Sequence, residues 1–167
     1  MSMVRAYIGL GANLDQPLLQ LQQAVAALSD IESTAVMAVS AFYGSKPMGP
    51  QDQPDYVNAV AALDTKLSAE RLLDALQQIE QQQGRQRKAD RWGPRTLDLD
   101  ILLFGNDVIN SNRLTVPHYG MRTREFVLYP LYEIAPALQL PDGTVLSSLL
   151  EQVPLNGLQK LHSSCSN

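Results

Sequence analysis

The segment Arg91-Trp92-Gly93-Pro94-Arg95-Thr96-Leu97-Asp98-Leu99-Asp100-Ile101-Leu102-Leu103-Phe104 is the stretch on which the interpretation of this chain depends. Its second half, 97–104, is almost continuously apolar, which predicts a β-strand covered on both faces. Asp98 and Asp100 are two residues apart, so both side chains point to one face, with Cα atoms roughly 7 Å apart. Carboxylates in apolar surroundings are costly unless positive charge meets them. A divalent metal shared with a phosphate would supply that charge, so the stretch predicts a metal–phosphate site.

A cationic loop comes directly before this strand. Five of the 13 basic residues lie between positions 84 and 96, although the net charge of the chain is −4. They are Arg85, Arg87, Lys88, Arg91 and Arg95. We interpret the loop as a site for a small polyanion, with a solvated surface loop as the alternative. An arginine beside a metal-bound phosphate would stabilise charge on a transferred group. The sequence leaves open whether Trp92 is a core side chain or a lid over a ligand.

The order of the predicted elements indicates the fold class. Strands are expected over 4–10, 35–43, 56–63 and 97–104, with one helix starting near Pro17 and another running from Ser68 to Gly84. This order is the split βαβ pattern, an α+β ferredoxin-like βαββαβ arrangement. It predicts an antiparallel sheet with helices on one face and a C-terminal extension, which carries short helices near 125–134 and 147–152. We expect residues 1–167 to form a single domain.

Composition excludes several classes of protein. The acidic net charge argues against general nucleic-acid binding. No apolar stretch approaches the roughly 20 residues that span a bilayer, and the N-terminus does not resemble a signal peptide. The single cysteine, Cys165, forms no intrachain disulfide. These features predict a cytoplasmic protein with no membrane and no nucleic-acid partner.

Motifs for nucleotide phosphates are missing. The sequence has no P-loop, and Gly9-Leu10-Gly11 lacks the third glycine of a dinucleotide fingerprint. A nucleotide would therefore be held by arginines and carboxylate-bound metal. Elsewhere, Tyr56 and Asn58 could stack on and hydrogen-bond a nitrogen heterocycle, or be satisfied by backbone groups. His118 is compatible with a surface turn or a phosphate contact, and Gln77 and Glu80 read as surface residues.

Three stretches carry a family resemblance, namely 49–58, 91–104 and 114–119. They resemble the 6-hydroxymethyl-7,8-dihydropterin pyrophosphokinases of folate biosynthesis, and the resemblance runs from about residue 4 to 141. It implies that the pterin hydroxymethyl oxygen attacks the β-phosphorus of ATP, so that the pyrophosphoryl group moves and AMP leaves. It also implies two Mg²⁺ ions, ATP as co-substrate, small-molecule partners only, and a monomer.

The resemblance further implies roles for individual residues. Asp98 and Asp100 are expected to bind the two metal ions, and Arg85 and Arg95 to stabilise the transferring phosphates as catalytic residues. The expected pterin-binding residues are Ser45, Met48, Tyr56, Asn58, Trp92 and Phe126. The expected ATP-binding residues are Gln77, Arg85, Lys88, Arg95, Ile101, Arg113, Thr115, His118, Tyr119 and Arg124.

Two departures and two alternatives accompany this interpretation. Ser45 and Lys46 stand where the family has a Thr-Pro-like pair, and the tail beyond about residue 151 does not match. A ferredoxin-like module that binds small molecules without chemistry would explain the fold, but not why two carboxylates follow five cations. A nucleic-acid-binding domain using the basic loop is disfavoured by the net charge and by the absence of an aromatic-studded sheet motif.

Overall fold

A six-stranded antiparallel sheet forms the centre of the computed structural model, which describes residues 3–12, 17–45, 56–84, 97–118, 120–154 and 158–160. The strand order is β5-β1-β4-β3-β8, and β2 also pairs with β4. The strands are β1 (Val4–Ala12), β2 (Thr34–Val39), β3 (Tyr43–Ser45), β4 (Tyr56–Thr65), β5 (Asp98–Phe104) and β8 (Gln159–Lys160). Without β3 and β8, the order β5-β1-β4-β2 is that of the predicted ferredoxin-like sheet.

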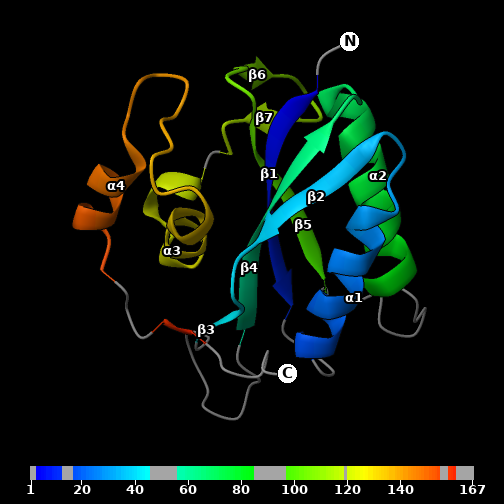
Figure 1. Ribbon diagram of the computed structural model, residues 1–167, viewed down its shortest axis with the longest axis horizontal. Coiled ribbons are helices and arrows are strands. Elements are labelled where there is room, and N and C mark those ends of the chain that lie inside the picture. The colour runs from blue at the N-terminus through cyan, green and yellow to red at the C-terminus, as the bar shows by residue number, and fades with distance from the viewer. Residues whose placement is uncertain are drawn as a thin grey trace.

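Helices α1 (Pro17–Ser29) and α2 (Ala69–Ile79) cover one face of the sheet (Figure 1). The start of α2 follows from the sequence, because the hydroxyl of Ser68 accepts a hydrogen bond from the backbone N–H of Arg71 at 3.2 Å. Leu72 and Leu76 of α2 and Leu21 of α1 are completely buried. They pack against alternate residues of β1, β4 and β5, including Ile8, Val57 and Leu99.

The second face of the sheet is covered by the C-terminal part of the chain. Helices α3 (Glu125–Ile134) and α4 (Leu146–Gln152) lie on the opposite side from α1 and α2 (Figure 1). Leu128 and Leu131 of α3 are fully buried against Val60 and Leu102 of the sheet. The two helices of the βαββαβ core thus lie on one face, as predicted, and the C-terminal extension, whose place the sequence did not predict, closes the other face. The extension is preceded by a small hairpin of β6 (Ile109–Asn110) and β7 (Thr115–Val116) and by the 3₁₀ turn Met121–Thr123.

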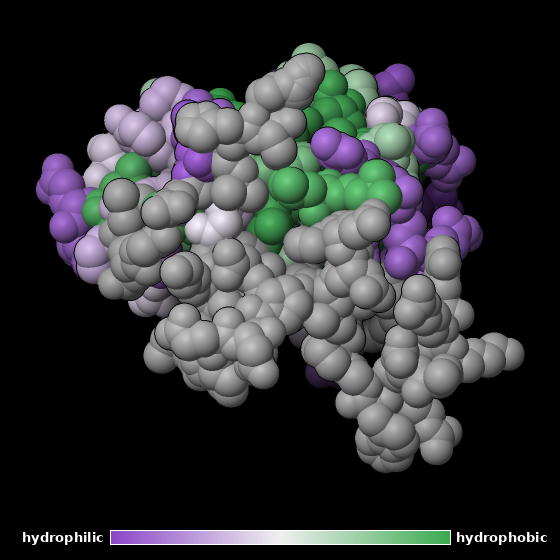
Figure 2. Space-filling model, turned by 90° about the horizontal axis from the view of Figure 1, so that it is seen from below, coloured by the Kyte–Doolittle hydropathy of each residue, from purple (hydrophilic) through white to green (hydrophobic). Residues whose placement is uncertain are grey.

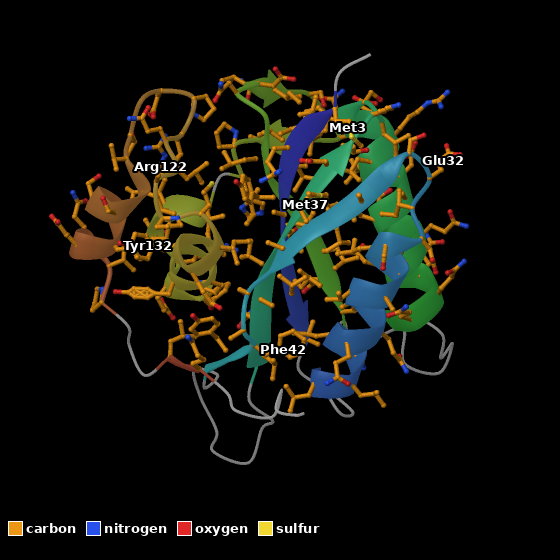
Figure 3. The ribbon with its side chains drawn as sticks, in the orientation of Figure 1. Met3, Glu32, Met37, Phe42, Arg122 and Tyr132 are labelled. Carbon is orange, nitrogen blue, oxygen red and sulfur yellow. The ribbon has the colours of Figure 1, made fainter. Side chains whose placement is uncertain are left out.

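The predicted strand 35–43 is interrupted. β2 pairs with the last part of β4 and β3 with its first part, and residues 40–42 between them leave the regular ladder. Ser40 is buried and fills the gap, because its backbone N–H donates to the carbonyl of Val60 at 2.8 Å. Its hydroxyl oxygen accepts the Val60 N–H at 3.0 Å, in place of a backbone carbonyl. Phe42, labelled in Figure 3, marks this break.

Helix α2 continues into the π-helical turn Glu80–Gly84, which matches the predicted end near Gly84. The remaining predicted boundaries agree with the structure to within two residues for the strands 56–63 and 97–104 and for the two C-terminal helices. Among the described residues, no helix is both long and apolar enough to cross a bilayer.

Candidate active site

Polar residues form a row across one end of the sheet. The strand register pairs Asp98 with Gly11, Gly11 with Asn58, and Asn58 with Tyr43. Residues that are directly paired in an antiparallel sheet share a face. Their neighbours Leu99, Leu10 and Val57 belong to the core under α1 and α2. The row therefore lies on the opposite face, which is the face that α3 covers.

Two glycines separate the carboxylates from Asn58. Gly9 pairs with Asp100 and Gly11 with Asp98, so no β1 side chain stands between the two polar strands at these positions. A Cβ atom added at Gly11 would lie 3.0 Å from Nδ2 of Asn58. The amide of this buried asparagine therefore lies close to the bare backbone of β1. Between the aspartates of β5 and the amide of β4, β1 thus presents backbone only, and the side chains of Leu102 and Asn58 pack against it, 3.3 Å and 3.0 Å from Cβ positions built at Gly9 and Gly11.

The aspartates are more exposed than the sequence predicts. β5 is covered on both faces along most of its length, as expected, but Asp98 is only half-buried and 52% of the Asp100 side chain is exposed. The reason is position, since both residues lie in the first half of β5, where the core beneath α3 ends. Their common orientation on one face agrees with the prediction. The high cost of buried carboxylates, however, does not apply to Asp100.

His118 lies next to Asp100. Its Nε2 atom is 4.0 Å from Oδ2 of Asp100, and its backbone N–H donates to the carbonyl of Leu102 at 3.0 Å. The Nδ1 atom accepts the N–H of Gly120 at 3.1 Å. Burial lowers the pKa of the imidazole, although the Asp100 carboxylate acts in the opposite direction. His118 is therefore neutral at pH 7 with its proton on Nε2, the nitrogen nearer to Asp100.

The start of α3 brings an arginine and an aromatic ring to the same region. The guanidinium carbon of Arg124 lies 5.8 Å from the ring centre of Phe126, a cation–π distance. A Cβ at Gly120 would come within 2.7 Å of that guanidinium, so only glycine allows Arg124 this position. Arg124 also lowers the pKa of His118, which shows that the two side chains are electrostatically close. His118 before Gly120 and Arg124 after it thus both contribute to the surface around Asp100.

Sequence reasoning missed Glu80. It is 8% exposed rather than a surface residue, and its Oε2 atom accepts the backbone N–H of Leu99 at 2.7 Å. Leu99 stands between the two aspartates on β5, which is an edge strand of the sheet. The carboxylate thus occupies an edge position where another strand would otherwise bind. The signal was available, because position 80 follows Leu72 and Leu76 at helical spacing on the buried side of α2.

Other predicted ATP-binding residues lie around α2 and the β6–β7 hairpin. Arg113 donates to Oδ1 of Asp74 at 2.6 Å and approaches Oε1 of Gln77 at 3.5 Å. The structure therefore brings Arg113 and Gln77 together, with a carboxylate partner that the sequence did not suggest. Thr115 is exposed on β7. The side chain of Ile101 is buried in the core, so a contact with ATP would have to use its backbone.

Several predicted residues lie outside the described part of the chain. These are Met48, Arg85, Lys88, Trp92, Arg95 and Tyr119. For Ser45 and Tyr56 only the backbone is described, at the end of β3 and the start of β4, where they pair with each other. Viewed from below, the described residues expose apolar surface in the middle of the molecule, with polar surface towards its sides (Figure 2).

The chemistry of the described residues fits a magnesium–phosphate site better than a closed metal cage. Within the described ranges, no group of three or more His, Cys, Asp and Glu side chains could hold a metal ion. Two carboxylates on one strand face remain, Asp98 and Asp100. Mg²⁺ commonly takes one or two protein carboxylates and completes its octahedral shell with water and substrate phosphates. The donor set therefore fits Mg²⁺ that arrives with a nucleotide.

Comparisons with known proteins agree with this reading. The family model described as 7,8-dihydro-6-hydroxymethylpterin-pyrophosphokinase matches residues 7–136. A 2-amino-4-hydroxy-6-hydroxymethyldihydropteridine pyrophosphokinase of Haemophilus influenzae is 54% identical over 160 residues, which are 96% of this chain and 99% of the relative. The protein of the same name from Pseudomonas aeruginosa is 55% identical over 157 residues, covering 94% and 96% of the two chains.

Solved structures share the fold. A structure titled as HPPK-DHPS in complex with substrates superposes with a TM-score of 0.71 at 10% identity, over 96% of this chain. The matched part is 47% of that longer chain. A Plasmodium falciparum HPPK-DHPS triple mutant gives a TM-score of 0.71 at 11% identity, over 90% of this chain and 43% of that one. At such identities, the likeness concerns the fold alone.

Proposed function

This chain belongs to the 7,8-dihydro-6-hydroxymethylpterin-pyrophosphokinase family, and we propose which of its residues bind the metal ions, the pterin and ATP in the family's reaction. The protein transfers the pyrophosphoryl group of ATP to the hydroxymethyl oxygen of 6-hydroxymethyl-7,8-dihydropterin, in folate biosynthesis. The new bond joins that oxygen to the β-phosphorus, and the bond from the β-phosphorus to the bridging α,β-oxygen breaks. AMP leaves with the bridging oxygen. Such a reaction depends mainly on alignment and on charge stabilisation.

Asp98 and Asp100 are the proposed ligands of two Mg²⁺ ions. The proposal is supported by their common face on β5 and by their position opposite two glycines of β1, which place no side chain beside the carboxylates. When bound, the ions would draw negative charge from the phosphates of ATP. His118 is proposed to contact an ATP phosphate through Nε2–H, supported by its neutral state and its 4.0 Å distance from Asp100.

The pterin ring is proposed to lie on the same face, between Tyr56 and Phe126, with its polar edge on the amide of Asn58. An amide offers both donors and an acceptor, which matches a pterin edge. The buried position of Asn58 beside Gly11 supports this role. For Ser45, Met48 and Trp92, the family resemblance alone supports contacts with the pterin.

ATP is proposed to approach from the side of α2, the β6–β7 hairpin and the start of α3. Arg113 and Gln77 are within reach of each other there, and Arg124 is close to His118. The other proposed ATP contacts are Ile101 through its backbone, Thr115 and Tyr119. Arg85, Lys88 and Arg95 are proposed to supply the cations that face the aspartates. We also propose a single domain over 1–167, a monomer, and a cytoplasmic location.

The single observation that carries this assignment is the row Asp98, Gly11, Asn58. In this row the carboxylate of Asp98 and the amide of Asn58 share one face with bare backbone between them, which supports a proposed metal site beside a proposed heterocycle site. The phosphates of ATP at Asp98 and the pterin ring at Asn58 would then be separated by β1 alone, so the two substrates would lie close enough for a group to pass from ATP to the pterin.

A product assay tests the assignment. The protein is incubated with ATP, Mg²⁺ and the hydroxymethyl dihydropterin, and the nucleotide product is identified. We expect AMP, whereas ADP would contradict pyrophosphoryl transfer and no turnover would favour a binding module. Asp98→Ala should lower kcat at least about a hundredfold, or roughly 2.7 kcal/mol of barrier. Asp107→Ala, an exposed aspartate after β5, is the matched control and should keep normal activity.

A further inference from the structure

Glu133 in the last turn of α3 joins that helix to the break between β2 and β3. Its Oε1 accepts the phenol O–H of Tyr43 at 2.6 Å. Its two carboxylate oxygens also accept the backbone N–H of Ala41, at 3.2 Å and 3.0 Å. One carboxylate therefore binds two donors of the segment in which the β4 ladder is interrupted. The break at residues 40–42 is held by a side chain of the facing helix and by Ser40, rather than by regular strand pairing.

Tyr43 connects this carboxylate to the candidate site. It is 7% exposed and pairs directly with Asn58, in the row that continues to Gly11 and Asp98. Burial raises the pKa of the Tyr43 phenol, and the hydrogen bond to Glu133 raises it further. The hydroxyl therefore remains protonated, and a donor, to a higher pH than that of an ordinary tyrosine. A buried tyrosine whose polar end has one fixed acceptor is held rigidly.

The other end of α3 carries Phe126 and Arg124. The body of the helix between the two ends is anchored by Leu128 and Leu131, which are completely buried against the sheet. A rigid helix transmits a displacement along its axis, because its interior packing tolerates little change. The bond at Glu133 thus fixes β3 relative to the helix that bears Phe126. Asn58 is one of the three β4 residues that pair with β3, and its partner there is Tyr43.

We propose that Glu133 is a positioning residue for the pterin subsite. It holds β3, and with it Asn58 and the backbone of Ser45, at a set distance from Phe126. The space between Asn58 and Phe126 therefore has the width of a flat heterocycle before the substrate binds. Glu133 contacts neither substrate and acts through Tyr43 and Ala41. The inference rests on the pterin-binding role proposed above for Asn58 and Phe126.

Loss of the Glu133 carboxylate should weaken binding of the pterin but not binding of ATP. Titration calorimetry in the presence of Mg²⁺ and a non-hydrolysable ATP analogue gives the Kd of the pterin, and steady-state kinetics gives both KM values and kcat. In Glu133→Ala, which loses three contacts, we expect the pterin Kd and KM to rise about tenfold, equal to about 1.4 kcal/mol. The KM for ATP and kcat at saturating pterin should stay within about twofold, because Asp98 and Asp100 on β5 are untouched.

Three more variants make the test specific. Tyr43→Phe removes one hydroxyl and should raise the pterin Kd about threefold, consistent with a single hydrogen bond. The double variant Tyr43→Phe/Glu133→Ala should bind the pterin no more weakly than Glu133→Ala alone, because Glu133→Ala already removes the bond that Tyr43→Phe removes. Tyr129→Phe is the matched control: it removes a tyrosine hydroxyl of the same helix, which donates to the carbonyl of Val153 at 2.7 Å. It should leave the pterin Kd unchanged.

The proposal is overturned if pterin affinity in Glu133→Ala stays within about twofold of wild type. It is also overturned if ATP affinity falls equally, or if Tyr129→Phe weakens the pterin as much. If Glu133→Ala does not fold, Tyr43→Phe decides by the same criteria. Wild-type protein that produces AMP from ATP and the pterin separates a failure of this inference from a failure of the proposed function.

Discussion

Replacing Glu80 is expected to affect both stability and catalysis. The Glu80 carboxylate is 8% exposed and accepts the N–H of Leu99 at 2.7 Å, while Leu99 itself is 4% exposed. A hydrogen bond to a charged group contributes about 1.5–3 kcal/mol, and a buried donor that loses its acceptor costs about 1–3 kcal/mol. Glu80→Ala should therefore lower the free energy of unfolding by about 2–3 kcal/mol. For a domain of this size, Tm should fall by roughly 5–10 °C.

The same change should loosen β5 between its two aspartates. Misplacement of reacting groups by about 1 Å costs up to about a hundredfold in rate, so we expect kcat to fall at least about tenfold. Glu80→Gln retains an acceptor oxygen and should lose only about 1 kcal/mol of stability. Gln81→Ala, an exposed neighbour in the same π-helical turn, is the control.

Thermal unfolding followed by circular dichroism and the AMP assay measure the two effects. A Tm for Glu80→Ala within about 1 °C of wild type would refute the reasoning about the Leu99 hydrogen bond. A large fall in Tm with unchanged kcat would instead show that Glu80 stabilises β5 without positioning Asp98 and Asp100.

Two further expectations concern other parts of the molecule. Gly11→Ala should raise the KM for the pterin more than Gly9→Ala, because its Cβ would lie 3.0 Å from Nδ2 of Asn58, whereas at Gly9 it would meet the flexible side chain of Leu102 at 3.3 Å; equal KM values would contradict the role of the bare backbone. The pKa of Asp142 is lowered from 3.8 to about 2, first by the N–H of Thr144 and also by Arg122. Its carboxylate therefore stabilises the folded state above the ordinary pKa, and this contribution is lost as the pH falls towards about 2. In urea unfolding, the difference between wild type and Asp142→Asn should be larger near about pH 6 than near about pH 3, and a constant difference would speak against this assignment.

The fold could be predicted largely because its signals are local. Pro17 at the start of α1, Ser68 as the cap of α2 and the apolar run of β5 each act on neighbouring residues. The ferredoxin-like sheet then follows from the order of elements. The break between β2 and β3 could not be predicted, because Ser40 and Glu133 supply hydrogen bonds from within the break and from a distant helix.

In the candidate site too, only the features that depend on local geometry and strand order could be predicted. The common face of Asp98 and Asp100 follows from strand geometry alone, and the proximity of Asn58 follows once the strand order is known. The exposure of Asp100 depends on where the core beneath α3 ends, which no local pattern encodes. Glu80 was misread because a charged residue was assigned to the surface by type, although its helical position indicated burial. The partner of Glu80 is the backbone N–H of Leu99, and a backbone group cannot be recognised as a partner from the amino-acid sequence.

The pairing of β3 with β8 has a consequence for the biogenesis of the protein. β3 has only three residues, and its outer edge is covered by Gln159–Lys160, which pair with Gly44 and Tyr43. During synthesis on the ribosome, β1 to β5 emerge long before the covering strand. A nascent chain would therefore expose an uncovered strand edge to neighbouring chains for most of its synthesis, when edge-to-edge association is a hazard. A variant shortened before residue 158 would keep that edge open permanently and should show its defect as aggregation at high concentration.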